Sequence, residues 1–371
     1  MRASLKVGRI MGIPINIHVT FLIILPLFAY VFATSSLEVF GFRLGFGDLE
    51  VDLLTKGILG TIAAIVFFVS VLIHELAHSY VALRNGYKIS GITLFIFGGV
   101  SQIEETPARA PGEALMAFVG PAASFLVGIV FIPIALAIDA LGSGLVYEAG
   151  FIAFGLIGFY NILLGAFNLL PAFPMDGGRI LRALLARRMS FSKATQTAAS
   201  IGRAFAIGMA IFGLFYNFIL IIIAIFIYFG AGEEEKSTRI SESLQGMKVR
   251  DLMTTDVSSV PSTMTLTGLL DKMLAEKHMG YPVVDGGRLV GVVTLNDASK
   301  VPREEQDSVT VERVMSHQVS SVSPETDAMD AVKTISSRRI GRLIVMQDGD
   351  MVGIVTRTDL MRALEILSTR S

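Results

Sequence analysis

The chain contains five long stretches without a single Asp, Glu, Lys or Arg, and these stretches limit what it can fold into. The hydrocarbon core of a bilayer, about 30 Å thick, is crossed by roughly 20 apolar residues in a helix. The composition agrees with membrane spans, since 52% of the residues are hydrophobic and only 17% are charged. The uncharged stretches are residues 10–37, 57–73, 114–138, 149–175 and 204–232.

The last stretch, 204–232, has 29 residues and is too long for one untilted crossing at about 1.5 Å per residue. We divide this region into two spans, 192–213 and 215–231, with a break near the sequence FGLFYN. The prediction is therefore about six spans, with Arg203 inside or at the edge of the fifth. The first stretch, 10–37, also resembles a signal peptide that would be cleaved after Ala33, but we favour a retained span.

Basic residues gather on one side of the membrane if the N-terminus is cytoplasmic. Eleven would then lie inside, whereas the outside loops carry only Arg43 and Lys56. This predicts a multi-pass protein of the cell membrane whose N-terminus and C-terminal part are cytoplasmic. The inside residues are Arg2, Lys6, Arg9, Arg84, Lys88, Arg109, Arg179, Arg182, Arg187, Arg188 and Lys193.

The sequence VLIHELAHSY, residues 71–80, places ionisable side chains at the end of an apolar run, where they are costly without a function. On a helix, His74 and His78 lie one turn apart on one face, with room for a metal between their rings, and Glu75 is placed to hold a water molecule. The chain has no cysteine, so disulfides and thiolate metal sites are excluded and any metal must be held by His, Asp or Glu.

A catalytic zinc site needs a third protein ligand and an open position. The candidate is Asp176, the first charge after 27 uncharged residues, where prolines break the helix in FNLLPAFPMDGGR. The predicted topology brings it and HELAH to the same side of the membrane at similar depth. Two alternatives stay open: Asp176 as a cap for a helix beginning at Gly177, and His18 as the ligand, although His18 is more simply an interfacial residue.

HELAH followed by NLLPAFPMDGG resembles the site-2 protease family of intramembrane zinc metalloproteases, over residues 1 to about 232. The prolines, Pro171 and Pro174, are spaced differently from the family pattern. The resemblance implies His74, His78 and Asp176 as ligands of one zinc ion and Glu75 as general base. It also places Asn168 near the metal, where it would help to bind substrate or the oxyanion.

Between the two motifs, GITLFIFGGVSQIEE (91–105) predicts a strand, a turn at Gly98 and Gly99, and a polar return strand. Such a hairpin beside the metal would offer an edge strand, to which an unwound substrate could add as a further strand. We therefore include both glycines among the substrate-binding candidates. The resemblance agrees, because family members have a membrane-embedded sheet here. An ordinary packing loop is the alternative. GPAAS (120–124) is interpreted as a site of close helix packing.

After a charged linker (232–246) the sequence repeats with a period of about 62 residues: VRDLMTTDVSSV at 249–260 matches VERVMSHQVSSV at 311–322. Each copy predicts a strand, a helix, two strands and a helix. The pair resembles tandem cystathionine-β-synthase (CBS) domains. That family implies adenosine nucleotide (AMP or ATP) contacts and a possible homodimer. The residues concerned are Thr294, Asp297, Thr356 and Asp359, which also fit ordinary helix caps.

The predicted fold is thus a polytopic α-helical membrane domain with a short β-hairpin or sheet near the active site (1–231), the linker, and a soluble α/β tandem CBS module (247–366, divided into 247–303 and 309–366). The predicted function is intramembrane zinc proteolysis of membrane protein substrates, regulated by nucleotide. The alternatives are a metal-ion transporter or channel regulated by CBS domains, and an inactive scaffold. A net charge of −1 and the lack of a basic tract give no indication of nucleic-acid binding.

Overall fold

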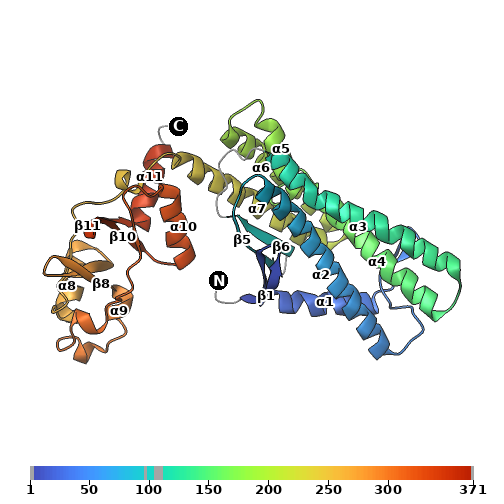
Figure 1. Cartoon of the computed structure of the whole chain (residues 1–371), viewed down its shortest axis with the longest axis horizontal. Coiled ribbons are helices and arrows are strands. Elements are labelled where there is room, and N and C mark those ends of the chain that lie inside the picture. The colour runs from blue at the N-terminus through green and yellow to red at the C-terminus, as the bar shows by residue number, and fades with distance from the viewer. Residues whose placement is uncertain (1–3, 96–97, 104–111, 369–371) are drawn as a thin grey trace. The chain divides into compact units, whose positions relative to one another are not determined.

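The computed structural model describes residues 4–95, 98–103 and 112–368. The chain divides into two compact units, Met1–Thr238 and Arg239–Ser371, which are described separately (Figure 1). The first unit contains long apolar helices and a small sheet, and the second contains short strands and helices. The predicted fold class, a helical membrane domain followed by an α/β module, is confirmed.

Four helices in the described part of the chain are long and apolar enough to cross a membrane. They correspond to the second to fifth predicted spans. The predicted total of about six is not confirmed, because α1 (Phe21–Thr34) has only 14 residues and is about 21 Å long. The four helices are α2 (Leu53–Arg84), α3 (Glu113–Leu141), α4 (Leu145–Asn168) and α6 (Phe191–Tyr216).

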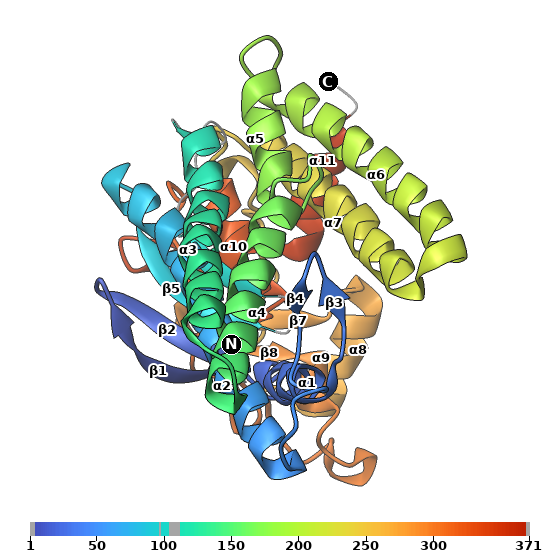
Figure 2. The same cartoon turned by 90° about the vertical axis from the view of Figure 1, so that its right-hand side faces the viewer.

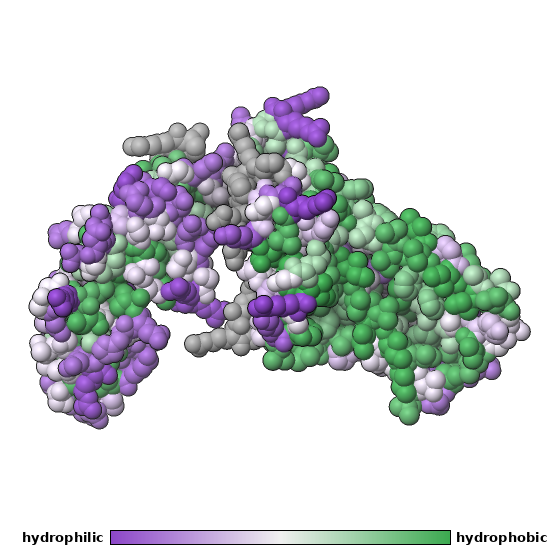
Figure 3. Space-filling model, in the orientation of Figure 1, coloured by the Kyte–Doolittle hydropathy of each residue, from purple (hydrophilic) through white to green (hydrophobic). Residues whose placement is uncertain are grey.

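One side of α2 carries a stripe of exposed aliphatic side chains at helical spacing. Exposed apolar stripes of this kind are unusual on a protein surface in water, and they fit contact with lipid. In Figure 3, hydrophobic residues cover much of the visible face of the unit that contains these helices. The stripe consists of Ile58, Ile62, Ile65, Val69 and Ile73.

Helix α7 (Phe218–Ser243) follows α6 after a break at Asn217, as predicted from FGLFYN. The helix continues through the first 12 residues of the segment predicted as a linker, because Glu and Lys are good helix formers. Arg203 on α6, which the span prediction leaves near the membrane, pairs with Glu235 of α7 at 2.8 Å. The charge is therefore balanced by a partner from the neighbouring helix.

A four-stranded sheet in the first unit has the order β1-β2-β5-β6. Strand β2 runs parallel to β5, and the other neighbours are antiparallel. The prediction of a first span over 10–37 is wrong at its start, because its first part forms β2 and the helix begins at Phe21. Figure 2 shows the β1–β2 hairpin in dark blue. The strands are β1 (Ser4–Ile10), β2 (Ile13–His18), β5 (Ile89–Phe95) and β6 (Gly98–Ile103), with a separate pair β3 (Glu38–Val39) and β4 (Phe42–Arg43).

Aromatic rings and small residues pack α1 against α2. The ring of Phe28 lies 5.6 Å from that of Phe67 and 5.4 Å from that of Phe68. Gly60 of α2 lies directly against α1, since a methyl group added there would be 2.5 Å from the Ala29 carbonyl oxygen. Small residues at such crossings let helix backbones approach closely, which is how helices associate in membranes.

The second unit has the predicted repeat: each copy has an extended first segment, a helix, two antiparallel strands and a helix. Strand β9 (Ser321–Val322) ends the first segment of the second copy, and the equivalent position of the first copy is a parallel bridge from Val260 to Val283. The remaining elements are α8 (Leu266–Glu276), β7 (Gly280–Asp285), β8 (Arg288–Thr294), α9 (Leu295–Ala298), α10 (Ala328–Arg338), β10 (Arg342–Gln347), β11 (Asp350–Thr356) and α11 (Arg357–Ser368).

The two copies exchange their first segments. Thr254, at the start of the first copy, bonds with Ile354 of β11, and Ser316, at the start of the second, bonds with Val292 of β8. Val249 is correspondingly buried in the core of the second copy, and Val311 in that of the first. The repeats therefore form one module, because each core is completed by the other copy.

Candidate metal centre and active site

The two histidines of HELAH lie on one face of α2, as their spacing predicts. Their Nε2 atoms are 3.1 Å apart. His74 is 4% exposed, and His78 is partly buried. Asp176 joins them from a distant part of the sequence: its Oδ2 is 3.3 Å from His74 Nε2 and 3.1 Å from His78 Nε2. The expected meeting of the two motifs is thus observed.

Asp176 reaches the histidines because the chain breaks between α4 and α5 (Asp176–Leu185). Helix α4 ends at Asn168, and a turn with a cis Phe173–Pro174 bond leads to Met175, the N-cap of α5. The interpretation of Asp176 as the cap is therefore wrong, since it is the first residue of the helix. His18 was the other candidate ligand. Its Nδ1 forms a hydrogen bond with Thr20 Oγ1 at 2.9 Å.

Helix α5 is fixed in place by Arg182, which is 7% exposed. Its Nε donates to Glu113 of α3 at 2.9 Å, and its Nη1 donates to Glu234 of α7 at 2.6 Å. The guanidinium also lies 5.0 Å from the centre of the Phe173 ring. A buried cation with two carboxylate partners ties three helices together beside the Asp176 loop.

Hydrogen bonds from α3 determine which ring nitrogens face the cluster. Nδ1 of His78 lies 2.6 Å from the backbone oxygen of Met116. A carbonyl oxygen only accepts, so this Nδ1 carries the proton and Nε2 keeps its lone pair. Nδ1 of His74 similarly lies 2.9 Å from Ser124 Oγ. A partner on the second nitrogen is the usual arrangement for histidines that bind metal.

The donor set fits zinc. Two imidazole nitrogens and one carboxylate oxygen converge within 3.3 Å, and a cation bound between them would offset the repulsion of their lone pairs. A tetrahedral site with bonds of about 2.0–2.1 Å has ligand atoms roughly 3.3 Å apart, close to the observed spacing. Gly120 of α3 leaves this space open, because a methyl group there would overlap His78 Nε2 and lie 2.7 Å from His74 Nε2.

Glu75 lies beside the cluster but is not part of it, in agreement with its helical position. Its Oε2 accepts a hydrogen bond from Ser101 Oγ of β6 at 3.0 Å, and Ser101 Oγ lies 3.0 Å from Ser79 Oγ of α2. Gly99 of β6 packs against the same side chain, because a methyl group there would overlap Glu75 Cγ. The carboxylate is thus held between its own helix and the edge strand of the sheet.

The predicted hairpin is present, since β5 and β6 are antiparallel and β6 is an edge of the sheet. The predicted position of the turn, at Gly98 and Gly99, is wrong. Phe95 pairs with Gly98, so both glycines belong to the start of strand β6. Gly98 has a φ of +125°, which favours glycine. The end of the predicted hairpin, residues 104–105, lies outside the described residues.

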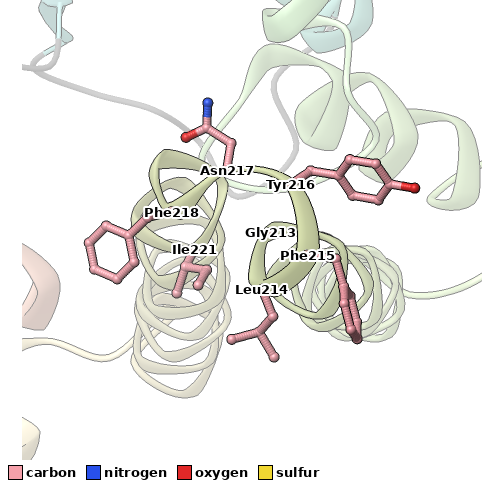
Figure 4. A pocket seen from close by; sticks show the side chains of 7 residues that line it. All are labelled: Gly213, Leu214, Phe215, Tyr216, Asn217, Phe218 and Ile221. Carbon is pink, nitrogen blue, oxygen red and sulfur yellow. The ribbon is translucent and has the colours of Figure 1, made fainter.

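Asn168, the further substrate candidate, is the last residue of α4, and its Nδ2 donates to the Leu164 carbonyl at 3.0 Å. A surface hollow lies away from all these residues, at the turn between α6 and α7 (Figure 4). Its lining includes Phe215, Tyr216 and Phe218, and no carboxylate or imidazole is among the described residues that line it. This hollow therefore offers no chemistry that competes with the metal cluster.

The four nucleotide candidates of the second unit form helix caps. The amide and hydroxyl of Thr294 both donate to Asp297 Oδ2, at 3.2 and 2.6 Å. Thr356 donates to Asp359 Oδ2 in the same way, at 2.9 and 2.7 Å. The capping alternative is observed at both places, and a nucleotide contact would be an additional role.

Comparison with known proteins identifies both parts of the chain. Residues 62–153 and 140–209 match the model of Peptidase family M50, and residues 249–304 and 311–366 match that of the CBS domain. The zinc metalloprotease MJ0392 of Methanocaldococcus jannaschii is 35% identical over 373 residues, which cover 100% of this chain and 98% of that protein. The chain belongs to peptidase family M50.

Other relatives of this M50 chain are similar over comparable lengths. The Rip3 protein of Mycobacterium tuberculosis is 32% identical over 383 residues, covering 99% of this chain and 94% of its own. The solved structure of a site-2 protease from Methanocaldococcus jannaschii is 37% identical, with a TM-score of 0.42, and covers 62% of this chain and 95% of that one. The predicted resemblance to the site-2 protease family and to CBS domains is confirmed.

Several residues around the M50 site were not singled out from the sequence. Gly120 and Ser124 belong to GPAAS, which was interpreted as a packing motif; they do pack closely, but against the two histidines. Their spacing of four residues on a span next to HELAH was the available signal. Ser101 carried none, because a serine in a strand has no pattern that indicates its partner.

Proposed function

We propose that the protein is an intramembrane zinc metalloprotease that hydrolyses peptide bonds in or near the transmembrane segment of membrane proteins. The observation that carries this proposal is the convergence of His74, His78 and Asp176 beside Glu75, at the end of a membrane-capable helix. His74, His78 and Asp176 would hold the metal through Nε2, Nε2 and Oδ2. Transport of a metal would need ligands but no adjacent base, so the arrangement favours hydrolysis.

The chain's own residues supply the proton transfers. Zinc bound at this cluster would supply Lewis acidity, which polarises a carbonyl and makes water acidic near neutral pH. Glu75 takes a proton from the attacking water and delivers it to the leaving amine. Asn168 is the candidate for stabilising the oxyanion, since a side-chain amide can donate a hydrogen bond there.

Strand β6 is the proposed docking site for the substrate backbone. Amides and carbonyls in an intact helix are bonded to each other, so a helical segment must unwind before cleavage. Among the described strands β6 is paired on one side only, so its other edge, beginning with Gly98 and Gly99, can pair with the unwound strand and present it beside Glu75.

The test compares the wild type with Glu75→Gln. Both purified proteins are expected to bind one zinc ion per chain, measured by atomic absorption, because the ligands remain. Only the wild type should cut a reporter polypeptide with one transmembrane helix. Zinc-dependent flux into liposomes without cleavage would instead establish the transporter alternative.

We also propose that the CBS module (247–366) binds an adenosine nucleotide that regulates the protease domain (1–231) through the connecting segment 232–246. Arg342 favours a phosphate-bearing ligand. Within the described part of the chain no carboxylate pairs with its guanidinium, and burial lowers its pKa. A half-buried unpaired cation is unfavourable, so an anion bound there would be stabilising.

Arg342 lies at one of the two cap sites. It packs against Gly280 of the other copy, since a methyl group there would be 2.6 Å from Arg342 Nη1, and Gly280 is the strand partner of Thr294. The equivalent residue of the first copy is Gly280 itself, which has no side chain, so the first copy supplies no matching guanidinium. The Thr294–Asp297 site is therefore the one with a cation available for phosphate.

Calorimetric titration with ATP and AMP tests this proposal. We expect one nucleotide per chain, with affinity about tenfold or more weaker in Arg342→Met, because a hydrogen bond to a charged group contributes about 1.5–3 kcal/mol. Asp359→Ala, at the other site, is the matched control and should retain binding. Absence of heat with either nucleotide would leave the module a structural or dimerising role.

Cytoplasmic placement of the N-terminus and the CBS module completes the proposal. The chain has no cysteine, so a single introduced cysteine reports its own accessibility without background. Gly246→Cys should be blocked by an impermeant thiol reagent only in inverted vesicles. Gly144→Cys, between α3 and α4, should be blocked only in right-side-out vesicles.

A further inference from the structure

The edge strand β6 contacts Glu75 at two positions on the same face. Residues two apart in a strand point the same way, so Gly99 and Ser101 both face α2. Gly99 leaves the space that the Glu75 side chain occupies: a methyl group there would also lie 3.0 Å from Cδ and 3.3 Å from Oε1. Ser101 then bonds the carboxylate at Oε2, 3.0 Å away. One residue makes room for the base, and the other holds it.

The directions of these hydrogen bonds follow from the groups involved. An ionised carboxylate only accepts, so the Ser101 hydroxyl donates its one proton to Glu75. Ser79 must then donate to Ser101 Oγ, 3.0 Å away. Ser79 is 1% exposed and lies one helical turn after Glu75 on α2. The base is therefore the end of a chain of hydroxyls that begins at a buried, fixed residue.

We infer that Ser101 is a positioning residue for the general base, and that it couples the position of β6 to that of the Glu75 carboxylate. This inference rests on the proposed proteolytic function. Hydrolysis requires the carboxylate to lie within hydrogen-bond reach of the attacking water, and a misplacement of about 1 Å can cost roughly a hundredfold in rate. Ser101 removes the freedom of Glu75 to turn away from the metal cluster.

A substrate strand that pairs with β6 adds to the strand that carries Ser101. Pairing of an edge strand fixes its backbone, so the bound substrate would also fix Ser101 and, through it, Glu75. A bound strand would thereby reinforce the position that Ser101 already gives the base. This links substrate recognition by the strand to the orientation of the catalytic carboxylate.

The experiment measures kcat and KM for cleavage of the single-span reporter by the full chain. Ser101→Ala should lower kcat about tenfold to a hundredfold, with KM and zinc content within about twofold of the wild type. Ser101→Thr keeps the hydroxyl and should restore most of kcat. Ser70→Ala is the matched control, because this buried α2 hydroxyl donates only to the Phe67 carbonyl; it should leave kcat unchanged.

A structure of zinc-loaded Ser101→Ala gives a reading that does not depend on activity. The Glu75 side chain should occupy more than one rotamer there and a single one in Ser101→Thr. Wild-type kcat in Ser101→Ala, an equal loss of kcat in Ser70→Ala, or an unchanged single Glu75 rotamer would overturn the inference. If the wild type binds zinc but cleaves no substrate, the proposed function is contradicted. In that case the Glu75 rotamers in Ser101→Ala and Ser101→Thr would still show whether Ser101 positions Glu75.

Discussion

Replacing Gly120 by alanine should remove zinc from the protein. The added methyl group would overlap His78 Nε2 and lie 2.7 Å from His74 Nε2, whereas ordinary contacts between such atoms are about 3.5 Å or longer. To relieve the contact with His74 alone, its ring would have to shift by roughly 0.8 Å or more. Zinc–nitrogen bonds tolerate about 0.2 Å, so the site cannot keep its geometry. We expect zinc affinity to fall more than about a hundredfold, beyond the effect of losing a partner of a ligand.

The assay is zinc content after dialysis against a weak chelator, together with cleavage of the reporter. Gly99→Ala is the informative companion, because the three atoms nearest to its methyl group would all belong to Glu75. It should keep zinc and lose cleavage, while Gly120→Ala loses both. Gly57→Ala on α2 is the neutral control, since nothing lies within 4 Å of the added group and alanine favours a helix by about 1 kcal/mol.

Retention of stoichiometric, tightly bound zinc by Gly120→Ala would refute the reasoning. It would mean that the metal does not occupy the space between α2 and α3 that Gly120 leaves open. Loss of zinc from Gly99→Ala would likewise contradict the assignment of Glu75 as a base that is not a ligand.

The remaining predictions concern stability, pH and metal removal. Arg182→Met should lower the free energy of unfolding by about 3–5 kcal/mol in denaturant titrations in detergent, because it leaves Glu113 buried without its partner. Arg182→Lys keeps the positive charge and should lose less stability. Equal losses of stability in the two variants would contradict the role of charge. Burial raises the pKa of Tyr281 to about 12, so the difference spectrum between wild type and Tyr281→Phe should show no phenolate near pH 10. Its contribution to stability is complete below pH 10 and decreases as pH rises from about 10 towards 12. Chelation by EDTA should abolish cleavage, and added zinc should restore it; activity that survives complete zinc removal would exclude the proposed chemistry.

The parts of the site that the sequence predicts are those with a fixed local spacing. HELAH indicates two ligands one turn apart on any helix, and the break before Asp176 follows from the prolines. Their meeting could be predicted from topology, because both lie at the same end of parallel-running spans. The caps at Thr294 and Thr356 and the repeat of the second unit are similarly local features.

Pairing across long sequence distances could not be predicted in the same way. Strand β2 pairs with β5 more than 70 residues later, and a six-residue strand at the start of an uncharged run has no periodicity that distinguishes it from the end of a span. The contact of Ser101 with Glu75 depends on the same non-local packing. The sequence therefore predicted the candidate ligands, the candidate base and the return strand beside them, but not the contact of Ser101 with Glu75.

Charged residues near spans show why the limits of the membrane helices were difficult to predict. The prediction left Arg203 without a partner inside or at the edge of the fifth span, and it ended the last span at residue 231, before the acidic run. In the structure Arg203 pairs with Glu235 and Arg182 pairs with Glu234, so charges of the presumed linker neutralise those of the helices before it. The same glutamates extend α7, because they are strong helix formers. The acidic run following the last apolar stretch is thus a structural part of the first unit, because its glutamates pair with arginines of α5 and α6.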